Sequence, residues 1–192
     1  GERPPTLAPP KYLVPGLGAG YDCDYVNAEV LLTRMSAENG KVVLPDGTSY
    51  RLLVLQNCTS PSEDISRLVG GFQRLDVSPV PSTEMSVAVI QKIRELVRNG
   101  VTLVGAPPKT SGDVTNARES DRQVQEIVAE IWGDLDGKTR TERNFGKGRV
   151  IWGKTPREIL LADGIQPDFK FNGQDTCLLY TSPSPRDGLL SR

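Results

Sequence analysis

The sequence contains no histidine. Without an imidazole it cannot build a Ser-His-Asp triad, a Cys-His dyad or a zinc site of the HExxH kind. Any chemistry would therefore have to use carboxylates, lysine, tyrosine, cysteine or a bound cofactor.

Cysteine is scarce, and long apolar runs and basic runs are missing. Three cysteines, Cys23, Cys58 and Cys177, are too few and too scattered for a disulfide framework or a cysteine-based zinc site. No apolar stretch approaches the roughly 20 residues that cross a bilayer. Lysine and arginine are spread along a chain of net charge −1. The sequence thus predicts neither a membrane nor a nucleic acid as partner.

The beginning of the chain shows no signal peptide, because Gly1 opens a proline-rich stretch without an apolar core. The chain also lacks an initial methionine, so we expect it to begin within a longer protein. Its 192 residues suit one domain of ordinary size. We predict a linker rich in proline and glycine at residues 1–20, a folded domain at residues 21–170, and a tail at residues 171–192.

The first half of the domain predicts one helix and two strands. The helix covers residues 25–35, with Asp24 as its N-terminal cap and the Asn39-Gly40 pair at its end. Strands follow at residues 41–44 and 49–56. The second contains four consecutive apolar residues, which is typical of a strand buried on both faces of a parallel sheet.

The second half continues the alternation. Its predicted helices cover residues 83–99, the stretch after a capping box of Ser120 and Gln123, and the stretch that begins at Thr155-Pro156-Arg157-Glu158. Its predicted strands are residues 101–104 and 149–152, and residues 57–82 are predicted as a loop with a short helix near residues 65–68. Such alternation indicates an α/β fold, flavodoxin-like or amidotransferase-like, with a parallel sheet and helices on both faces.

The tail departs from this pattern. Its SPSP run at residues 182–185 cannot form a helix and would interrupt a central strand. The run LLYTSPSPR at residues 178–186 also resembles a translated sequencing adapter. The tail is therefore interpreted as an artefact, the alternative being a disordered natural tail.

Residues 148–155 match the phosphate-loop pattern GxxxxGK[ST] letter for letter. A phosphate loop needs its four middle residues as loop, so that their N–H groups can turn toward the phosphates. Here those residues are a predicted strand, and Thr155 suits a helix cap before Pro156. We interpret the match as coincidental. The glycines of residues 16–20 are likewise assigned to the linker, because Tyr21 stands where a dinucleotide motif needs its third glycine.

Acidic residues are the remaining candidates for catalysis. Glycosidic cleavage needs two carboxylates that face each other across a sugar, about 5–9.5 Å apart. Glu126 and Glu130 lie one helical turn apart on a predicted solvated face, and Glu158 and Asp163 lie near another helix. We interpret all four as surface charges, and no catalytic pair is predicted in this chain.

The segment from Tyr21 to Tyr25 (YDCDY) combines aromatic rings, which stack on sugars, with carboxylates, which accept hydrogen bonds from hydroxyl groups. A helix cap with packing tyrosines explains the same residues, and local evidence favours that explanation.

Several motifs together resemble one family. They are GYDCDYVN at residues 20–27, AEVLL at 28–32, LPDGTSYRLLVL at 44–55, IRELVRNGV at 93–101, VGAPP at 104–108, GKGRV at 146–150 and GIQPDF at 164–169. In order and spacing they are similar to the α-L-rhamnosidases of glycoside hydrolase family 106, in the region after the catalytic barrel. The resemblance covers roughly residues 1–175.

The resemblance implies that the parent protein is a large, exported, multidomain bacterial glycosidase that removes α-L-rhamnose from plant polysaccharides or glycosides. Its two catalytic glutamates would lie on a (β/α)₈ barrel outside this chain, and calcium is possible in the parent. No cofactor or metal is expected in this segment. Its partners would be the barrel and sandwich domains of the same polypeptide, together with the carbohydrate substrate. Residues that could contact the substrate are Tyr21, Asp22, Asp24 and Asn27. The alternative is a free-standing flavodoxin-like module that binds a small ligand at the carboxyl ends of its strands.

A third hypothesis, a nucleotide-binding protein, leads to a direct test. Because the glycine-lysine motif coincides with a predicted strand, we expect the chain to show no measurable affinity for ATP in calorimetry. The Lys154→Ala variant should behave like the wild type. ATP binding that disappears in Lys154→Ala would restore the phosphate-loop interpretation.

Overall fold

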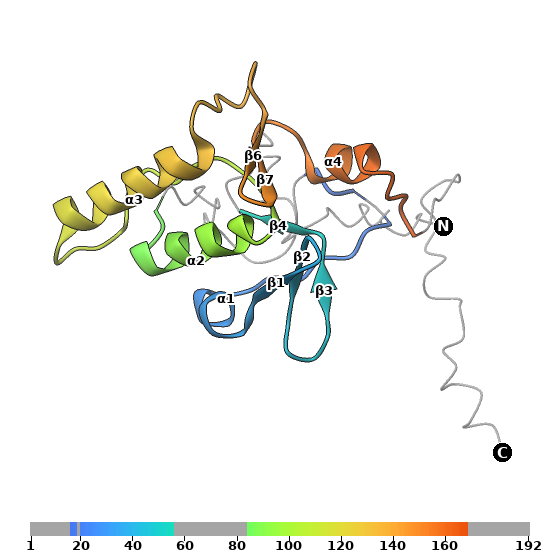
Figure 1. The fold of residues 1–192 in the computed structure, drawn as a ribbon, viewed down its shortest axis with the longest axis horizontal. Helices are drawn as coiled ribbons and strands as arrows, with labels where there is room; N and C mark the ends of the chain where they lie inside the picture. Colours follow the sequence, from blue (N-terminus) through green and yellow to red (C-terminus); the bar gives the residue numbers. More distant parts are fainter. Residues whose placement is uncertain (1–15, 19, 56–83, 169–192) are drawn as a thin grey trace, which may run out of the picture.

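Four helices and two β-sheets make up the part of the chain that the structure describes (Figure 1). The structure is a computed structural model that describes residues 16–18, 20–55 and 84–168. Three predicted features lie outside the described residues: the loop at 57–82 with its short helix, the tail at 171–192, and most of the linker.

The larger sheet is mostly parallel. Its strands follow the order β4-β5-β7-β6, with β4, β5 and β7 parallel and β6 antiparallel to β7. The bounds are β4 (Leu52–Val54), β5 (Thr102–Val104), β6 (Glu142–Phe145) and β7 (Gly148–Ile151). The central strand β5 is buried at all three positions, as a strand between two helical layers should be. The predicted parallel arrangement is confirmed for three strands, and the sheet as a whole is mixed.

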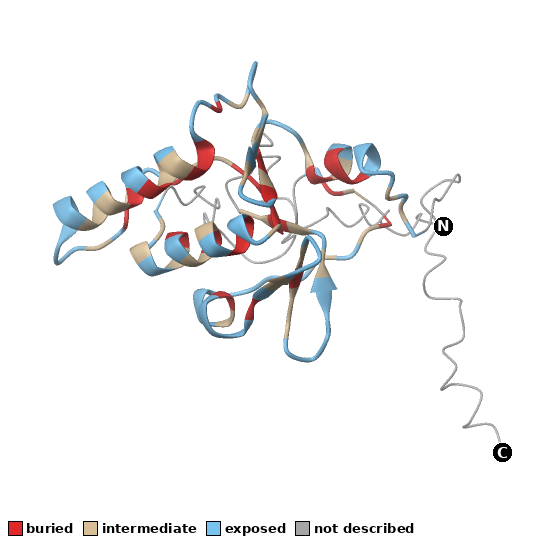
Figure 2. Cartoon of the chain, viewed as in Figure 1, coloured by how far each residue is buried: buried red, intermediate tan, exposed pale blue. Residues whose placement is uncertain are grey.

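Helices cover both faces of this sheet, as predicted. The bounds are α2 (Val87–Arg98), α3 (Ala117–Trp132) and α4 (Pro156–Ala162). The aligned residues Leu53, Leu103 and Val150 face the main core that α2 and α3 complete. On the opposite face, Ile159 of α4 packs against Ile151. Buried residues accordingly line the inner sides of these helices and the strands between them (Figure 2).

A second, antiparallel sheet follows directly after the first helix. Helix α1 (Ala28–Arg34) stops before β1 (Ser36–Glu38), which pairs with β2 (Lys41–Val43). Glu38 pairs with Lys41, and the two residues between them, Asn39 and Gly40, have φ of 51° and 77°. This is a two-residue hairpin turn of the Asn-Gly kind. The expectation that Asn39-Gly40 ends a helix was therefore wrong.

The predicted strand at residues 49–56 is divided between the two sheets. Its first part is β3 (Ser49–Tyr50), which pairs with β2, and its second part is β4 at the edge of the larger sheet. The sequence did not reveal this division, because only Arg51 separates the two parts. The predicted strand at 41–44 likewise forms, but in the antiparallel sheet.

Of the three predicted helix caps, two were wrong and one is confirmed. Asn27, and not Asp24, caps α1. Helix α3 begins at Ala117, so Ser120 and Gln123 lie inside it instead of capping it. Thr155 and Glu158 do form the predicted capping box of α4, with a proline in the first turn.

Two further segments differ from expectation. Strand β6 was not predicted from the sequence, because an edge strand whose residues alternate between exposed and half-buried needs no apolar run. The last residues of the predicted linker are packed: Leu17 is buried, and its carbonyl oxygen accepts from Arg157 Nη1 at 3.3 Å. Residues 16–18 and 20 therefore pack against the folded unit.

Backbones of three segments meet at the C-terminal end of α2. Gly100 follows this helix with a φ of 119°, and a Cβ built there would lie 3.4 Å from Cα of Gly40 in the hairpin turn. Gly148, at the start of β7, does not have a positive φ, yet a Cβ there would overlap the carbonyl oxygens of Val97 and Val101. Only hydrogen fits at Gly148, and Gly100 needs glycine because of its positive φ, so we call this contact the glycine junction.

We expect Gly148→Ala to lower the free energy of unfolding by about 1–3 kcal/mol, the usual range for overpacking a filled site. The two oxygens that the methyl group would meet are backbone atoms and cannot rotate away. Urea denaturation followed by circular dichroism measures the change.

Gly47→Ala is the matched control, because nothing lies within 4 Å of a Cβ at that turn. Its φ of 88° leaves only backbone strain, of about 1 kcal/mol. A Gly148→Ala variant that unfolds at the same urea concentration as the wild type would contradict the proposed overlap.

Candidate functional site

The segment of residues 21–27 runs from the α4 side of the molecule to the start of α1 and carries all four candidate substrate residues (Figure 1). Tyr21 is held at its beginning. Its hydroxyl donates to the carbonyl oxygen of Ile165 at 2.8 Å, and the guanidinium of Arg157 lies 5.5 Å from its ring centre. Tyr21 therefore ties the segment to α4 and the residues after it.

Asp24 pairs with a residue that the sequence did not single out. The hydroxyl of Tyr50, in β3, donates a hydrogen bond to the Asp24 carboxylate. This bond and the nearby carboxylate charges, with some desolvation, raise the pKa of Tyr50 to about 12. Tyr50 is therefore a neutral phenol throughout the physiological range, and Asp24 links the segment to the antiparallel sheet.

Asp22 bonds to the backbone of the next residue, Cys23. Asp22 Oδ1 accepts from the backbone N–H of Cys23 at 2.9 Å. Burial, followed by the charges of Asp22 and Asp24, raises the pKa of the Cys23 thiol. A thiol with a raised pKa stays protonated at neutral pH and is a poor nucleophile. This position therefore does not favour cysteine-based catalysis.

Asn27 ends the segment as the N-terminal cap of α1. Its Oδ1 accepts from the N–H of Val30 at 2.9 Å, which satisfies one of the free donors of the first turn. The four candidates thus share one extended segment, and each has an intramolecular hydrogen bond. Contact with a sugar stays a prediction for all four. The alternative explanation, a helix cap with packing tyrosines, fits two of them. Tyr21 packs against Arg157, and Asn27 caps α1 in place of Asp24.

The phosphate-loop pattern is a strand followed by a helix start. Residues 148–151 are β7, and Thr155 is the cap of α4. Lys154 Nζ lies 3.2 Å from Glu142 Oε2 of the neighbouring strand β6. The backbone here is committed to sheet hydrogen bonds and does not form an anion-binding cradle.

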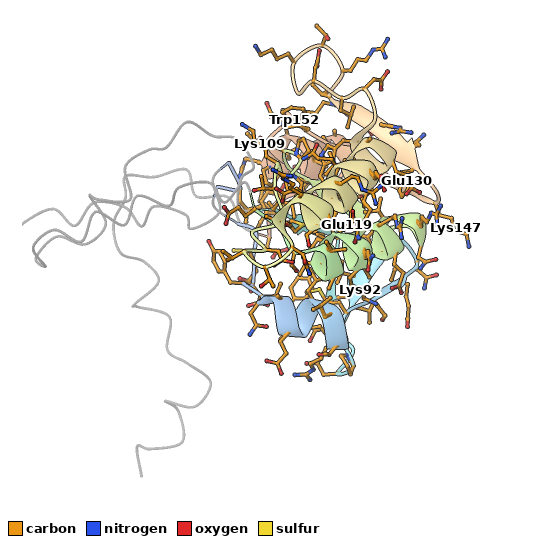
Figure 3. All side chains as sticks on the ribbon, turned by 90° about the vertical axis from the view of Figure 1, so that its left-hand side faces the viewer. Lys92, Lys109, Glu119, Glu130, Lys147 and Trp152 are labelled. Carbon is orange, nitrogen blue, oxygen red and sulfur yellow. The ribbon has the colours of Figure 1, made fainter. Side chains whose placement is uncertain are left out.

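The four acids considered for catalysis form ion pairs or a helix cap within the fold. Glu130 of α3 pairs with Arg94 and Arg98 of α2, at 3.1 and 3.0 Å. Glu126 pairs with Arg122 on its own helix. Glu158 belongs to the capping box of α4, and Asp163 pairs with Arg149 of β7. Figure 3 shows Glu119 and Glu130 on the side of the molecule that α3 presents.

The pKa values of the carboxyl groups also argue against a catalytic acid among the described residues. In the described ranges, every carboxyl group with a resolved shift has a lowered pKa: Asp46, Asp113, Glu119, Asp121, Asp136 and Glu158. Hydrogen bonds to the charged carboxylate are the main cause in each case. The pKa of Glu119, for example, falls to about 2 because Arg122 and Gln123 donate to it. A glycosidase general acid needs the opposite, a raised pKa.

The carboxyl ends of the parallel strands are where a small-ligand module of this class would bind. There the indole N–H of Trp132 donates to the carbonyl oxygen of Gly105 at 2.9 Å, inside the core. Gly137 lies against the ring of Trp152, and a Cβ on Gly137 would come within 2.7 Å of it. Side chains therefore fill much of this edge.

A hollow lies elsewhere among the described residues. It is an open groove of about 700 Å³ on the outer side of α2, lined by Leu32, Ala88, Gln91, Lys92, Arg94, Glu95, Arg98 and Asn99. Its arginines pair with Glu130, and Lys92 pairs with Glu95 at 3.2 Å. This paired surface offers no catalytic constellation.

Metal-binding clusters and membrane-spanning helices are absent from the described ranges. Within them, no group of three or more histidine, cysteine, aspartate or glutamate side chains is arranged to hold a metal ion. No helix there is both long enough and apolar enough to traverse a bilayer.

Tyr50 and Arg157 are the partners that sequence reasoning missed. Neither has a local signal, because Tyr50 meets Asp24 across 26 residues and Arg157 meets Tyr21 across more than a hundred. Only the fold brings them to the segment.

Comparisons with known proteins agree on one family. A family model described as alpha-L-rhamnosidase matches residues 2–69 and 71–187. A solved rhamnosidase structure from Novosphingobium sp. PP1Y is similar with a TM-score of 0.62 and 27% identity, over 85% of this chain and 13% of that chain. A protein of Formosa agariphila named "Putative beta-glucuronidase" is 27% identical over 152 residues, which are 79% of this chain and 11% of that protein. The chain therefore spans only about an eighth of the length of these relatives.

Asp24→Asn should bring the pKa of Tyr50 down from about 12 toward the ordinary value near 10, because it removes the charged acceptor of the phenol hydrogen bond. Since the folded pKa is raised, the stability from this contact is fully present below pH 10. It is lost as the pH rises through 12. Absorbance titration at 295 nm follows the ionisation, and Tyr50→Phe identifies which transition belongs to Tyr50.

Asp46→Asn serves as the control, because Asp46 acts on Tyr50 only through its more distant charge. Its tyrosine titration should stay close to that of the wild type. If Asp24→Asn titrates like the wild type, the Tyr50–Asp24 bond is not what raises this pKa.

Proposed function

Because this chain belongs to glycoside hydrolase family 106, the α-L-rhamnosidase family, we propose that it is a non-catalytic accessory segment of a larger enzyme. That enzyme would release rhamnose from plant polysaccharides or glycosides. The segment would support the catalytic barrel and would carry out no chemistry alone.

The observation that carries this proposal is the match to a solved rhamnosidase over 85% of this chain but only 13% of that one. A segment of that share leaves most of the longer protein to house the catalytic barrel. The fold supports an accessory role as well, because two helical layers on a mostly parallel sheet form a self-contained unit.

The charged groups of the described residues also support a non-catalytic role for this segment. Their acids are bound in ion pairs and caps, and their resolved carboxyl pKa values are lowered. An inverting glycosidase needs one acid with a raised pKa and a base about 6.5–9.5 Å away. We therefore place the two catalytic carboxylates in the barrel, outside this chain.

Rhamnose is the proposed sugar because the family model and the solved structure both refer to rhamnosidases. The relative from Formosa agariphila carries the name of a different glycosidase, so the test includes a glucuronide. Within the same proposal the parent is exported, calcium belongs to the parent and not to this segment, and the layered sheet is of the flavodoxin-like kind. Asp22 and Asp24, which are exposed, are the candidates that could reach a substrate beside the barrel.

We expect the isolated chain to release no nitrophenol from p-nitrophenyl α-L-rhamnoside above the buffer rate, because its described residues include no acid and base that face each other across a sugar. The polypeptide as its gene encodes it should hydrolyse this compound and leave p-nitrophenyl β-glucuronide intact. Absorbance at 400 nm measures both reactions.

The Glu130→Gln and Asp24→Asn variants are the internal checks. Activity of the isolated chain that either substitution abolishes would overturn the accessory role. A gene product that hydrolyses only the glucuronide would leave the accessory role in place and correct the sugar.

A further inference from the structure

The described part of the chain begins and ends at the same place. The N–H of Asp168 donates to the carbonyl oxygen of Gly20 at 2.7 Å, and Tyr21 reaches Ile165 at 2.8 Å. Four residues earlier, the carbonyl oxygen of Gly16 accepts from the N–H of Arg157 at 3.2 Å. Both ends of the coloured ribbon accordingly meet beside α4 (Figure 1).

Residues 22–26 continue from this point along the surface, outside any helix or strand. Among the described residues, none of their backbone groups bonds to another backbone group, and only the N–H of Cys23 donates to a side chain, that of Asp22. Their side chains include two large apolar ones that are unusually open, Tyr25 at 55% and Val26 at 39% exposure. Unpaired backbone groups beside exposed apolar side chains are suited to pairing with another strand.

We propose that the junction face, which comprises residues 22–26 and residues 165–168, is the docking surface for the neighbouring domain of the same polypeptide, to which residues 22–26 add as a strand. This inference rests on the proposed function, because it takes the chain as one segment of a longer protein. The matched rhamnosidase, of which this fold covers 13%, shows how much further chain is present in such a protein.

The geometry favours this occupant over a carbohydrate. The two ends of the described chain are adjacent to the face, so the neighbouring parts of one polypeptide reach it without crossing the molecule. Tyr21 and Asn27, the polar residues at either end of the segment, already have intramolecular partners. Between them, the exposed carboxylates of Asp22 and Asp24 each accept a hydrogen bond within the chain. The rest of the segment offers unpaired backbone and apolar surface, which a strand edge matches better than sugar hydroxyls do.

Hydrogen exchange on two lengths of the protein tests the proposal. In the 192-residue chain, amide protons of residues 22–26 should exchange at nearly unprotected rates, because they lack backbone partners. In the polypeptide as its gene encodes it, their exchange should be slower by about 100-fold or more. Peptides from β5, which is buried in the sheet, should be protected in both and report that the fold is intact.

Two variants of the longer polypeptide sharpen the result. Val26→Asp should remove the protection of residues 22–26, because a charge would enter the docked surface. Val114→Asp, at a valine that is 96% exposed, should leave the protection unchanged. Tyr25→Ser provides a milder substitution at the same face and should also speed exchange.

Equal exchange of residues 22–26 in the two lengths would overturn the proposal. Slower exchange in the 192-residue chain on addition of rhamnose alone would also overturn it, because the face would then bind carbohydrate. Rhamnoside hydrolysis by the longer polypeptide is measured separately. Protection without hydrolysis would contradict the proposed function but not the docking surface. Hydrolysis without protection would contradict the docking surface but not the proposed function.

Discussion

Close backbone contact at the glycine junction holds the two sheets and their main helix together. Gly100 and Gly40 let the exit of α2 touch the hairpin of the antiparallel sheet, and Gly148 lets the start of β7 touch the same helix end. Side chains are absent from this contact, so the distances are set by backbone atoms that cannot adjust. Gly146 extends the contact, since a Cβ there would lie 2.7 Å from Arg98.

Charged residues in the described part consolidate this arrangement instead of forming a reactive site. Glu130 joins α3 to two arginines of α2, and Arg149 joins β7 both to β6 and to the end of α4. Exposed ion pairs of this kind contribute little individually. Their effect here is to occupy carboxylates that would otherwise be candidates for acid or base, which suits a segment that supports chemistry performed elsewhere.

The candidate substrate residues in the segment of residues 21–27 also have structural roles. Tyr21 and Asn27 fix its two ends, and Asp24 fixes its middle to Tyr50. An extended stretch anchored at three points presents its remaining backbone and its apolar side chains in a defined direction. A surface held in a fixed orientation suits a boundary between domains, because the neighbouring domain can then pack in one position.

The sequence alone determined whatever depends on neighbouring residues: the absence of histidine chemistry, the capping box of α4, the amphipathic pattern of α2 and α3, and the apolar strands of a parallel sheet. The tertiary structure decided the rest. Asn39-Gly40 fits a helix end and a hairpin turn equally well, and only pairing between Ser36–Glu38 and Lys41–Val43 selects the turn. Polar strand β6 exists because β7 offers it an edge, and Asp24 serves Tyr50 because folding brings them together. Contacts between distant residues leave no local pattern, since their free energy appears only once the chain has closed the loops between them.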